Sequence, residues 1–481
     1  MADEKIKHAG DYIIEDLRLV TTTGLEVDLK TSVVGITLFE NIHSMTITGQ
    51  ITISDSANLS SHGPLLGQEY LHLKIRTPTA NPDSSTTIDF SENALYVYSI
   101  SKRKKLNDRI QGFVLNFASQ ELIKNQRLRV VQSLTDTWSN IVKKMLTDKK
   151  YLNTKKRIDL EPTSGVKKFV APNMRPLDLI SLAMKQSISE FKGEPTYLFY
   201  ETLKGFNFRT LASLYNNASL VEYTTFAPAT NIVPDGQPGA GSVDVFKDMR
   251  TILDYNIIPT NNSIASYRTG MYGSKLITHD IISKSYETKT YNYHDNWENE
   301  SHIVSGVTEG TPDFPLVSHL SITEEGLRVS DFPSKTFLMP TSLSGGVDSQ
   351  HQTENNTSPY MAYDPHKWAQ RRNSQMVQLE NALQVNILVH GNTLINVGDK
   401  VLVNIPYTSV AKGAKDEKFD KFYKGPFLIK TIRHDFFATE KPSHKMYIQL
   451  VKDSLEERLL DTGPLEPSSS KASVVEEYKY N

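Results

Sequence analysis

The chain has 481 residues, with 53 lysines and arginines against 55 aspartates and glutamates, and a usual domain size of about 100–200 residues predicts three or four domains. Its hydrophobic content of 38% and charged content of 22% are typical of globular proteins and exclude wholesale disorder. The absence of cysteine excludes disulfides, cysteine-bound metals and cysteine nucleophiles, and agrees with assembly in a reducing cytoplasm. The charged residues 3–5 predict no signal peptide, and no apolar run is long enough for a membrane-spanning helix.

Residues 1–122 carry the signature of strands. Apolar residues alternate with polar ones in three segments, which is the period-two pattern of half-buried antiparallel strands. The alternating apolar residues are Ile47, Ile51 and Ile53, then Leu71, Leu73 and Ile75, and then Phe113, Leu115 and Phe117. We therefore predict a first β-barrel over 1–122.

The next segment, 123–225, changes to helical spacing and predicts an inserted α/β domain. The first helix is expected behind a capping box at 133–136, with a buried stripe of Trp138, Ile141, Val142, Met145 and Leu146. A second helix begins at Pro176, a residue tolerated in the first turn, and carries Leu177, Ile180, Met184 and Ile188. Two short aromatic runs around Gly205 predict a β-hairpin.

Two stretches rich in Gly, Pro, Ser, Thr and Asn interrupt the rest of the chain. Residues 227–242 form the first, within a predicted flexible linker at 226–243, and residues 341–359 form the second, near the end of a β-rich segment at 244–363. The last residues, 456–481, are expected to be a mobile tail.

Residues 364–455 predict one helix followed by a closing β-barrel. Asp364 and Pro365 are a typical helix start, and the expected apolar stripe of the helix is Trp368, Met376, Leu379 and Leu383. Four strands follow, at 385–389, 400–405, 427–432 and 446–451. We expect Val385, Ile387, Val389, Val401, Val403 and Ile405 to point inward, and Lys400 and Asn404 to lie on the opposite, solvent-facing side.

The search for catalytic and ligand-binding residues finds no candidate. The chain has no zinc-binding His-Glu-x-x-His helix, no Walker phosphate loop and no nucleophile-elbow serine. The glycine-rich stretch 236–241 contains proline and is interpreted as linker. The pairs His279–Asp280 and His434–Asp435 are sequence neighbours, which point to opposite faces of a strand. We therefore predict no catalytic, cofactor-binding or metal-binding residue, and no enzyme activity.

The segment 102–157 stands out for its charge, with fifteen basic residues against four acidic ones. One interpretation is a patch that docks an acidic partner or nucleic acid. The other, which we favour on the sequence, is the solvated face of helices and loops, because the lysines share segments with an apolar stripe.

The strand-rich ends resemble the central hub proteins of contractile phage tail baseplates, the family of late-control tail proteins and spike-complex hubs. The segments that carry this resemblance are 39–55 (FENIHSMTITGQITISD), 63–69 (GPLLGQE), 384–401 (QVNILVHGNTLINVGDKV), 423–429 (YKGPFLI) and 432–436 (IRHDF). The order of first barrel, helical insertion and closing barrel adds to it. The loops at 227–242 and 341–359 depart from the family pattern.

The resemblance implies a mainly β fold with an α+β insertion, in which two tail-tube-like antiparallel β-barrels accompany a helical and hairpin domain. It further implies a homotrimer in the virion baseplate, assembled in the host cytoplasm. The spike protein is expected below it, the tube initiator and tape measure above it, and wedge proteins beside it. DNA would only pass through, and no cofactor is expected.

Three alternatives remain open on the sequence. The same hub could serve a bacterial contractile injection or secretion apparatus. A tail-associated peptidoglycan hydrolase would need a paired acid and nucleophile, and the 55 acidic residues single out no such pair. A host-binding adhesin would need exposed aromatic platforms, whereas Trp138 and Trp368 lie on predicted helical stripes.

Overall fold

A computed structural model describes residues 8–56, 59, 65–78, 87–225, 244–258, 262–281, 283–304, 314–317, 326–341, 363–406, 419–438 and 442–456. The predicted linker at 226–243, most of the loop at 341–359 and the predicted tail beyond residue 456 lie outside the described residues.

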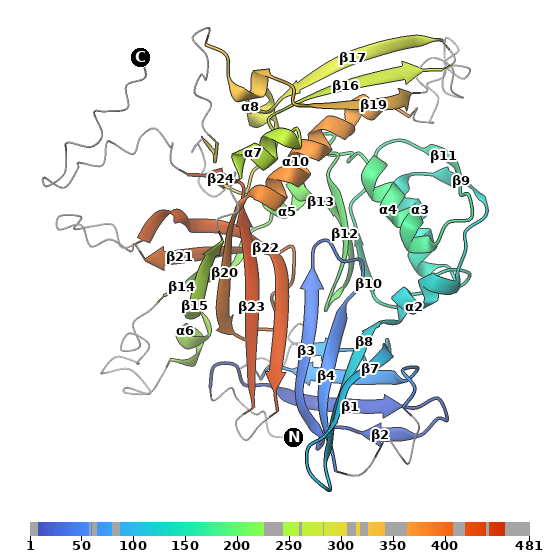
Figure 1. Cartoon of the computed structure of the whole chain (residues 1–481), viewed down its shortest axis with the longest axis vertical. Coiled ribbons are helices and arrows are strands. Elements are labelled where there is room, and N and C mark those ends of the chain that lie inside the picture. Colours follow the sequence, from blue (N-terminus) through green and yellow to red (C-terminus); the bar gives the residue numbers. More distant parts are fainter. Residues whose placement is uncertain are drawn as a thin grey trace, which may run out of the picture.

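The largest element of the fold is one sheet of fourteen strands (Figure 1). Its main path runs β15-β20-β23-β22-β3-β4-β8-β7-β5-β1-β2, while β14 and β21 pair beside β22 and β6 pairs with β5. The central strand β22, Phe419–Phe437, is 19 residues long and joins the two halves of the sheet. Its first part pairs with β21 and its last part with β3, while β23 pairs along the other edge.

The N-terminal half of the sheet contains β1–β8 and encloses its own apolar core. The three sequence patterns that predict strands lie in β4, β5 and β8, and their apolar residues are buried. The strands are β1 Ile13–Val20, β2 Glu26–Asp28, β3 Val33–Asn41, β4 Thr48–Asp55, β5 Tyr70–Arg76, β6 Thr87–Asp89, β7 Leu95–Lys105 and β8 Gln111–Ser119.

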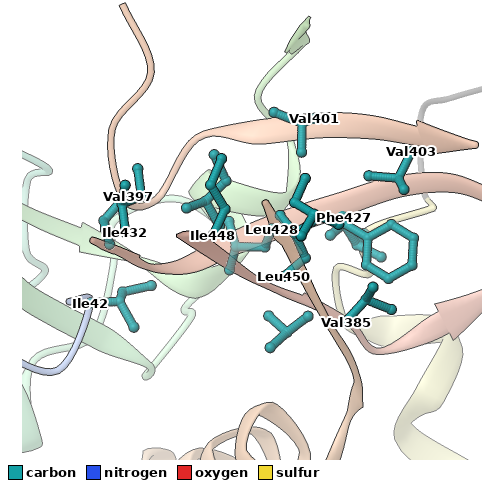
Figure 2. Packing of buried hydrophobic residues seen from close by; sticks show 14 of the residues in the cluster. Ile42, Val385, Val397, Val401, Val403, Phe427, Leu428, Ile432, Ile448 and Leu450 are labelled. Carbon is teal, nitrogen blue, oxygen red and sulfur yellow. The ribbon is translucent and has the colours of Figure 1, made fainter. Parts of the chain in front are cut away.

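The closing half contains the four predicted strands and two more. β20 Leu383–His390, β21 Lys400–Pro406, β22 and β23 Ser443–Lys452 are joined by β14 Ser219–Thr224 on β21 and by β15 Ile252–Ile258 on β20. Val385, Val401 and Val403 point into a common core, as predicted (Figure 2), and Ile387 belongs to the same buried cluster. The outer strands β14 and β15 meet in one isolated parallel bridge, between Thr224 and Thr251.

Lys400 corrects one prediction about this half. It lies at the start of β21, where we expected a solvent-facing side chain, but its side chain is buried and Nζ donates a hydrogen bond to the backbone oxygen of Tyr215, 2.7 Å away. The short helix α5, Leu211–Tyr215, covers this side of the strand and supplies the acceptor. Asn404 is half-buried, as its position on the outer side of the strand predicts.

The inserted segment contains both predicted helices and the predicted hairpin. Its helices are α2 Gln120–Arg127, α3 Trp138–Thr147 and α4 Pro176–Gln186, and its strands are β9 Ser133–Asp136, β10 Arg157–Leu160, β11 Lys167–Val170, β12 Tyr197–Thr202 and β13 Gly205–Thr210. The predicted capping box is wrong. Ser133–Asp136 is a strand that pairs with β11, and the side chain of Thr137 caps α3 instead.

Strand β12 connects this segment to the closing half, because every residue in it is buried. Tyr197 and Phe199 pack into the core of the inserted segment, whereas Leu198 and Tyr200 pack into the core of the closing half. Adjacent strand residues point to opposite faces, so a strand buried on both faces joins two cores.

A smaller sheet lies at the top of Figure 1, beside the long helix α10, Ala369–Asn381. It contains β16 Gly273–Asp280, β17 Ser285–Asn292 and β19 Lys335–Thr341. Short elements lie near it, namely α7 Ser263–Arg268, α8 Tyr293–Asn296, η3 Trp297–Asn299, η4 Val329–Asp331 and η5 Pro365–Lys367. The short helix α6, Val245–Met249, lies instead beside the closing half, at the lower left of Figure 1. A two-residue strand β18, Phe314–Pro315, pairs with β24, Ser454–Leu455.

The predicted stripe of α10 is only part of its buried face. Leu379 is in the core of the closing half and Met376 and Leu383 pack against that core, but most of the fully buried residues of the helix are polar. The predicted start is correct, since Asp364 caps the short 3-10 helix that leads into α10.

The mainly β fold class with an α+β insertion is confirmed. The two sheet halves correspond to the two predicted barrels, but the described pairings leave the strand order of the N-terminal half open between β2 and β3.

Candidate functional site

The sheet presents a continuous outer face across β4, β3, β22, β23, β20 and β15. In these strands the buried residues alternate with half-buried or exposed ones. Cross-strand pairs continue from one half of the sheet to the other, because Arg433 lies opposite Phe39 on one side and Tyr447 on the other. Leu388 then lies opposite Tyr447. One face is therefore shared by both halves.

This outer face carries few and balanced charges. Its positions are Thr48, Gln50, Thr52, Gly35, Thr37, Phe39, Asn41, Thr431, Arg433, Asp435, Phe437, Lys445, Tyr447, Gln449, Asn386, Leu388, His390, Asp254 and Asn256. The two positive charges, on Arg433 and Lys445, equal in number the two negative charges, on Asp435 and Asp254, so the formal net charge of the face is zero. The guanidinium of Arg433 also bonds to Asp435 at 2.8 Å and lies over the ring of Tyr447.

Under this face, a buried polar cluster joins the sheet halves. Glu40 is fully buried and accepts hydrogen bonds from the backbone N–H groups of Leu203 and Val397, at 3.1 and 3.0 Å. It thereby connects β3, the β12–β13 hairpin and the loop before β21. The imidazole of His434 lies beside this carboxylate, with Nε2 3.7 Å from an oxygen of Glu40.

His434 belongs to a pair of buried imidazoles. Its Nδ1 lies 3.1 Å from Nε2 of His444, so one of the two rings donates to the other. Both side chains are fully buried, and the ring of Phe436 stacks on His444 at 4.0 Å. Burial, followed by the neighbouring His434, holds the pKa of His444 well below its usual value. His444 is thus a neutral ring at the junction of the sheet halves at neutral pH.

A second buried cluster joins the N-terminal half to the inserted segment. Lys156 bonds to Glu121 at 2.8 Å and to Glu201 at 2.6 Å. Glu201 also accepts hydrogen bonds from the backbone of Ile47 and the hydroxyl of Ser119, both in the N-terminal half. Burial raises the pKa of Glu201, while the Lys156 ammonium lowers that of Glu121 against the effect of burial. One cation therefore serves two buried carboxylates.

The polar face of α10 holds three parts of the molecule together. Arg372 is buried and donates to the backbone oxygens of Pro195 and Tyr197 in the inserted segment. Ser374 and Gln370 donate to backbone oxygens of Met271 and Ser274, beside or within the smaller sheet. Further along, Gln378 donates to Tyr293 and to the backbone oxygen of Asp453 in the closing half.

Two buried carboxylates lie beside this helix and are the nearest approach to a catalytic pair. Glu194 and Glu300 share Arg371, at 3.2 and 3.4 Å, and both accept from Gln375. Burial raises the pKa of Glu194, against the opposing effect of Arg371. The cavity beside Glu300 measures only about 10 Å³, which is too small to admit a sugar ring. This arrangement is structural in character.

A polar cavity of about 170 Å³ lies where the β12–β13 hairpin meets the loop before β21. Arg157, Lys204 and Arg209 face Asp159 and Asp399 across it. Since these charges nearly balance and Arg209 lies 3.9 Å from Asp159, the cavity presents no convergent set of groups for one ligand.

The residues that the sequence singled out for charge or chemistry fall in separate places. His434 points inward and Asp435 outward, where Asp435 accepts from Thr37 and Arg433, so the two neighbours do not pair. Likewise His279 is exposed and Asp280 buried. The basic residues of 102–157 are scattered over the tip of the β7–β8 hairpin at the bottom of Figure 1, the helices α2 and α3, and the start of β10, where Lys156 is buried.

In the described part of the chain, no group of three or more His, Cys, Asp or Glu side chains is arranged to hold a metal ion. Within the same residues, no helix is both long enough and apolar enough to cross a membrane. The buried clusters around Lys156, His434 and Glu194 were not found by sequence reasoning, because their members come from segments far apart in the chain.

Comparison with known proteins finds similarity only at the level of structure. No protein-family model matches the chain, and no curated protein matches it. Among solved structures, a tail protein from Neisseria meningitidis MC58 is 9% identical, with 92% of this chain and 97% of that chain covered at a TM-score of 0.44. The 43 kDa tail protein of prophage MuSo2 from Shewanella oneidensis is 9% identical, with 91% and 98% covered at a TM-score of 0.46.

A third similar structure is the c3393 protein of E. coli, described as a component of the type VI secretion system with structural similarity to the T4 tail proteins gp27 and gp5. It is 10% identical, with 93% of this chain and 78% of that chain covered at a TM-score of 0.39. All three TM-scores lie below 0.5, so the functional proposal rests on the residues of this chain.

Proposed function

We propose that this chain is a non-enzymatic structural subunit of a phage tail baseplate, a hub that forms a homotrimeric ring between tail tube and spike and lets DNA pass. The observation that carries the proposal is the outer face of the sheet, which is continuous across both halves and carries balanced charges. The resemblance of segments 39–55 and 384–401 to baseplate hubs supports it.

A surface along which a polyanion slides must have neither an excess of positive charge nor an excess of negative charge. Excess positive charge would bind the phosphates, and excess negative charge would repel them from the passage. The outer face meets both conditions, because Arg433 and Lys445 are offset by Asp435 and Asp254 and most other positions are Thr, Gln, Asn or apolar. In this proposal the face lines the channel, and the inserted segment and α10 lie outside it.

The shared strand β22 supports the same proposal mechanically. It is paired along both edges and ties the two halves into one sheet. The two buried polar clusters then fix the inserted segment to both halves. A ring subunit under load during ejection needs such rigid connections between its parts.

A charge substitution in assembled particles tests the proposal. Thr48→Lys with Asn386→Lys adds two positive charges to the face, and we expect DNA ejection in vitro to slow by roughly threefold or more. Thr288→Lys with Thr336→Lys adds the same charge to the exposed smaller sheet and should leave ejection unchanged. Equal ejection rates for the two variants would exclude the face as the channel lining.

The trimer is tested separately by light scattering on the chain mixed with its spike protein. The complex should contain three copies of the 54.2 kDa chain. A single copy per spike complex would contradict the ring. Clearing of peptidoglycan by the purified chain would contradict the absence of enzyme activity.

A further inference from the structure

The tip of the β7–β8 hairpin is a protruding basic ribbon. All eight residues from Lys102 to Arg109 are exposed. Five of them are basic, Lys102, Arg103, Lys104, Lys105 and Arg109, and one is acidic, Asp108. The turn is closed by a backbone hydrogen bond from Leu106 to Ile110, and Arg103 donates to Gln111 across the ribbon. The cationic side chains are therefore held on a defined two-stranded structure.

The second group of basic residues, on and after α3, has an ordinary structural explanation. Lys143, Lys144, Lys149 and Lys150 are exposed, but α3 buries Met145 and Leu146 on its other face. The lysines are thus the solvated side of an amphipathic helix. No such explanation applies to the hairpin tip, because none of its eight residues is buried. Four of the cations are consecutive residues of β7, and the partners of Lys104 and Lys105 on β8 are the uncharged Gly112 and Gln111, so β8 does nothing to offset the repulsion among them.

We propose that the hairpin tip, residues 102–109, binds the phosphate backbone of double-stranded DNA. A two-stranded β-ribbon fits the major groove of B-DNA, which is about 12 Å wide. The ladder is irregular between Ser101 and Lys104, where Lys102 has a positive φ, and regular pairing resumes at Lys104 and Lys105, whose side chains point to opposite faces of the ribbon. Arginine adds bidentate contacts to phosphate.

The composition of the tip favours DNA over an acidic protein. Protein–protein interfaces are depleted of lysine and enriched in aromatic residues. The tip contains three lysines and no aromatic residue, and Leu106 is its one exposed large apolar side chain. Recognition through phosphates alone predicts binding without sequence preference.

This inference goes beyond the proposed channel and does not depend on it. The hairpin adjoins the outer face through the pairing of β8 with β4, so a DNA end held by the tip would lie beside a surface with no net charge. Binding by the isolated chain is nevertheless a property of the tip alone, and its failure would leave the ejection test untouched.

The test is fluorescence anisotropy of a labelled 20-base-pair duplex with the purified full chain, measured across a salt series. The variant Lys102→Gln, Arg103→Gln, Lys104→Gln, Lys105→Gln should lose roughly tenfold or more in affinity, and its salt dependence should be shallower by about 2–4 in slope, since each phosphate contact contributes about 0.9. The matched variant Lys143→Gln, Lys144→Gln, Lys149→Gln, Lys150→Gln removes the same charge from α3. It should bind within about twofold of the wild type. Circular dichroism melting of both variants checks that the fold is intact.

Three results would overturn the proposal. The first is no measurable binding by the wild type at low salt, and the second is an equal loss in the two variants, which would show a general effect of net charge. The third is displacement of the duplex by polyglutamate at equal charge concentration, which would assign the tip to an acidic protein. Loss confined to the tip variant, together with resistance to polyglutamate, would support DNA binding.

Discussion

The core of the closing half differs in polarity from the contacts that join this half, the N-terminal half, the inserted segment and α10, which we call the seams. The core is apolar, with Val385, Val401, Val403 and Phe427 among fully buried side chains packed between strands (Figure 2). The seams are equally buried but polar, as the Lys156 cluster and the face of α10 show. Each unit is thus stabilised by apolar burial, while the joins between units depend on hydrogen bonds and ion pairs.

The difference matters because the two kinds of contact fail differently. An apolar core tolerates changes of similar shape and polarity, and loses stability in proportion to the area or volume lost. A buried polar join loses most when one partner is removed and the other is left unpaired. The apolar cores therefore set the stability of each unit, and the polar joins set whether the units keep one relative position.

The largest effect is expected from Val403→Asp in the apolar core. Val403 is fully buried on β21, between Gly425 of β22 and Tyr223 of β14. An unpaired carboxylate there should cost several kcal/mol against a domain stability of about 5–15 kcal/mol. We expect the closing half to unfold, as seen by loss of a cooperative thermal transition, and particles to lack a baseplate.

The control for this prediction is Asn404→Ser, one residue further along β21 on its outer side. It should change the free energy of unfolding by about 0.5–1 kcal/mol at most. Lys400→Gln would be a neutral control if Lys400 faced solvent, as the sequence predicts, but Lys400 is buried and bonded to the backbone of Tyr215. If Val403→Asp and Asn404→Ser melt alike, the register of β21 assigned to the core is wrong.

The next largest effect is expected at a polar join. Lys156→Met leaves Glu121 and Glu201 buried without their cation, and should cost about 3–5 kcal/mol in urea unfolding at neutral pH. Adding Glu121→Gln and Glu201→Gln should recover most of that loss, since three neutral side chains no longer need a counter-ion. If the single substitution costs less than the triple one, the cluster does not act as a coupled join.

A smaller effect concerns pH and the paired imidazoles. The pKa of His444 lies well below its usual value in the folded protein and near 6.5 when unfolded, so below about pH 6.5 the unfolded chain binds a proton that the folded one does not. Stability should therefore fall by about 1.4 kcal/mol per pH unit below that value until the folded pKa is reached.

The variant His444→Phe tests the assignment, because it removes the titrating ring while keeping the stack on Phe436. Its urea-unfolding free energy should fall less steeply between pH 6.5 and pH 5 than that of the wild type, whatever its absolute stability. The neighbouring groups His434 and Glu40 remain in both proteins. An unchanged slope would assign the acid sensitivity to other groups.

The contrast between core and seam also explains what the sequence could predict. The alternation of apolar and polar residues correctly predicts the buried faces of β4, β5 and β8, because alternation is a local property of each strand. The seams have no such period. Glu40 meets Val397 across 357 positions, and the pattern of α10 gives no sign that Gln375 and Gln378 are buried. The predicted cap of α3 is wrong for a related reason, since only the partner strand β11 shows that Ser133–Asp136 is extended.

The smallest expected effect is at Glu380, on the last turns of α10. Its carboxylate bonds to His43 at 2.9 Å and to Lys430 at 2.7 Å, and these contacts, His43 first, lower its pKa to about 2. A carboxyl group whose pKa is lowered by folding stabilises the folded protein at any pH above its pKa in the unfolded chain. That contribution is lost as the pH falls from about 4.5 to 2. Because half of the side chain is exposed, solvent screening limits Glu380→Gln to about 0.5–1 kcal/mol at pH 7. Its free energy of unfolding should converge on that of the wild type near pH 2–3, whereas the exposed Glu92→Gln should match the wild type throughout. A loss of several kcal/mol, or one that persists in acid, would show that Glu380 positions α10 through packing rather than through its charge.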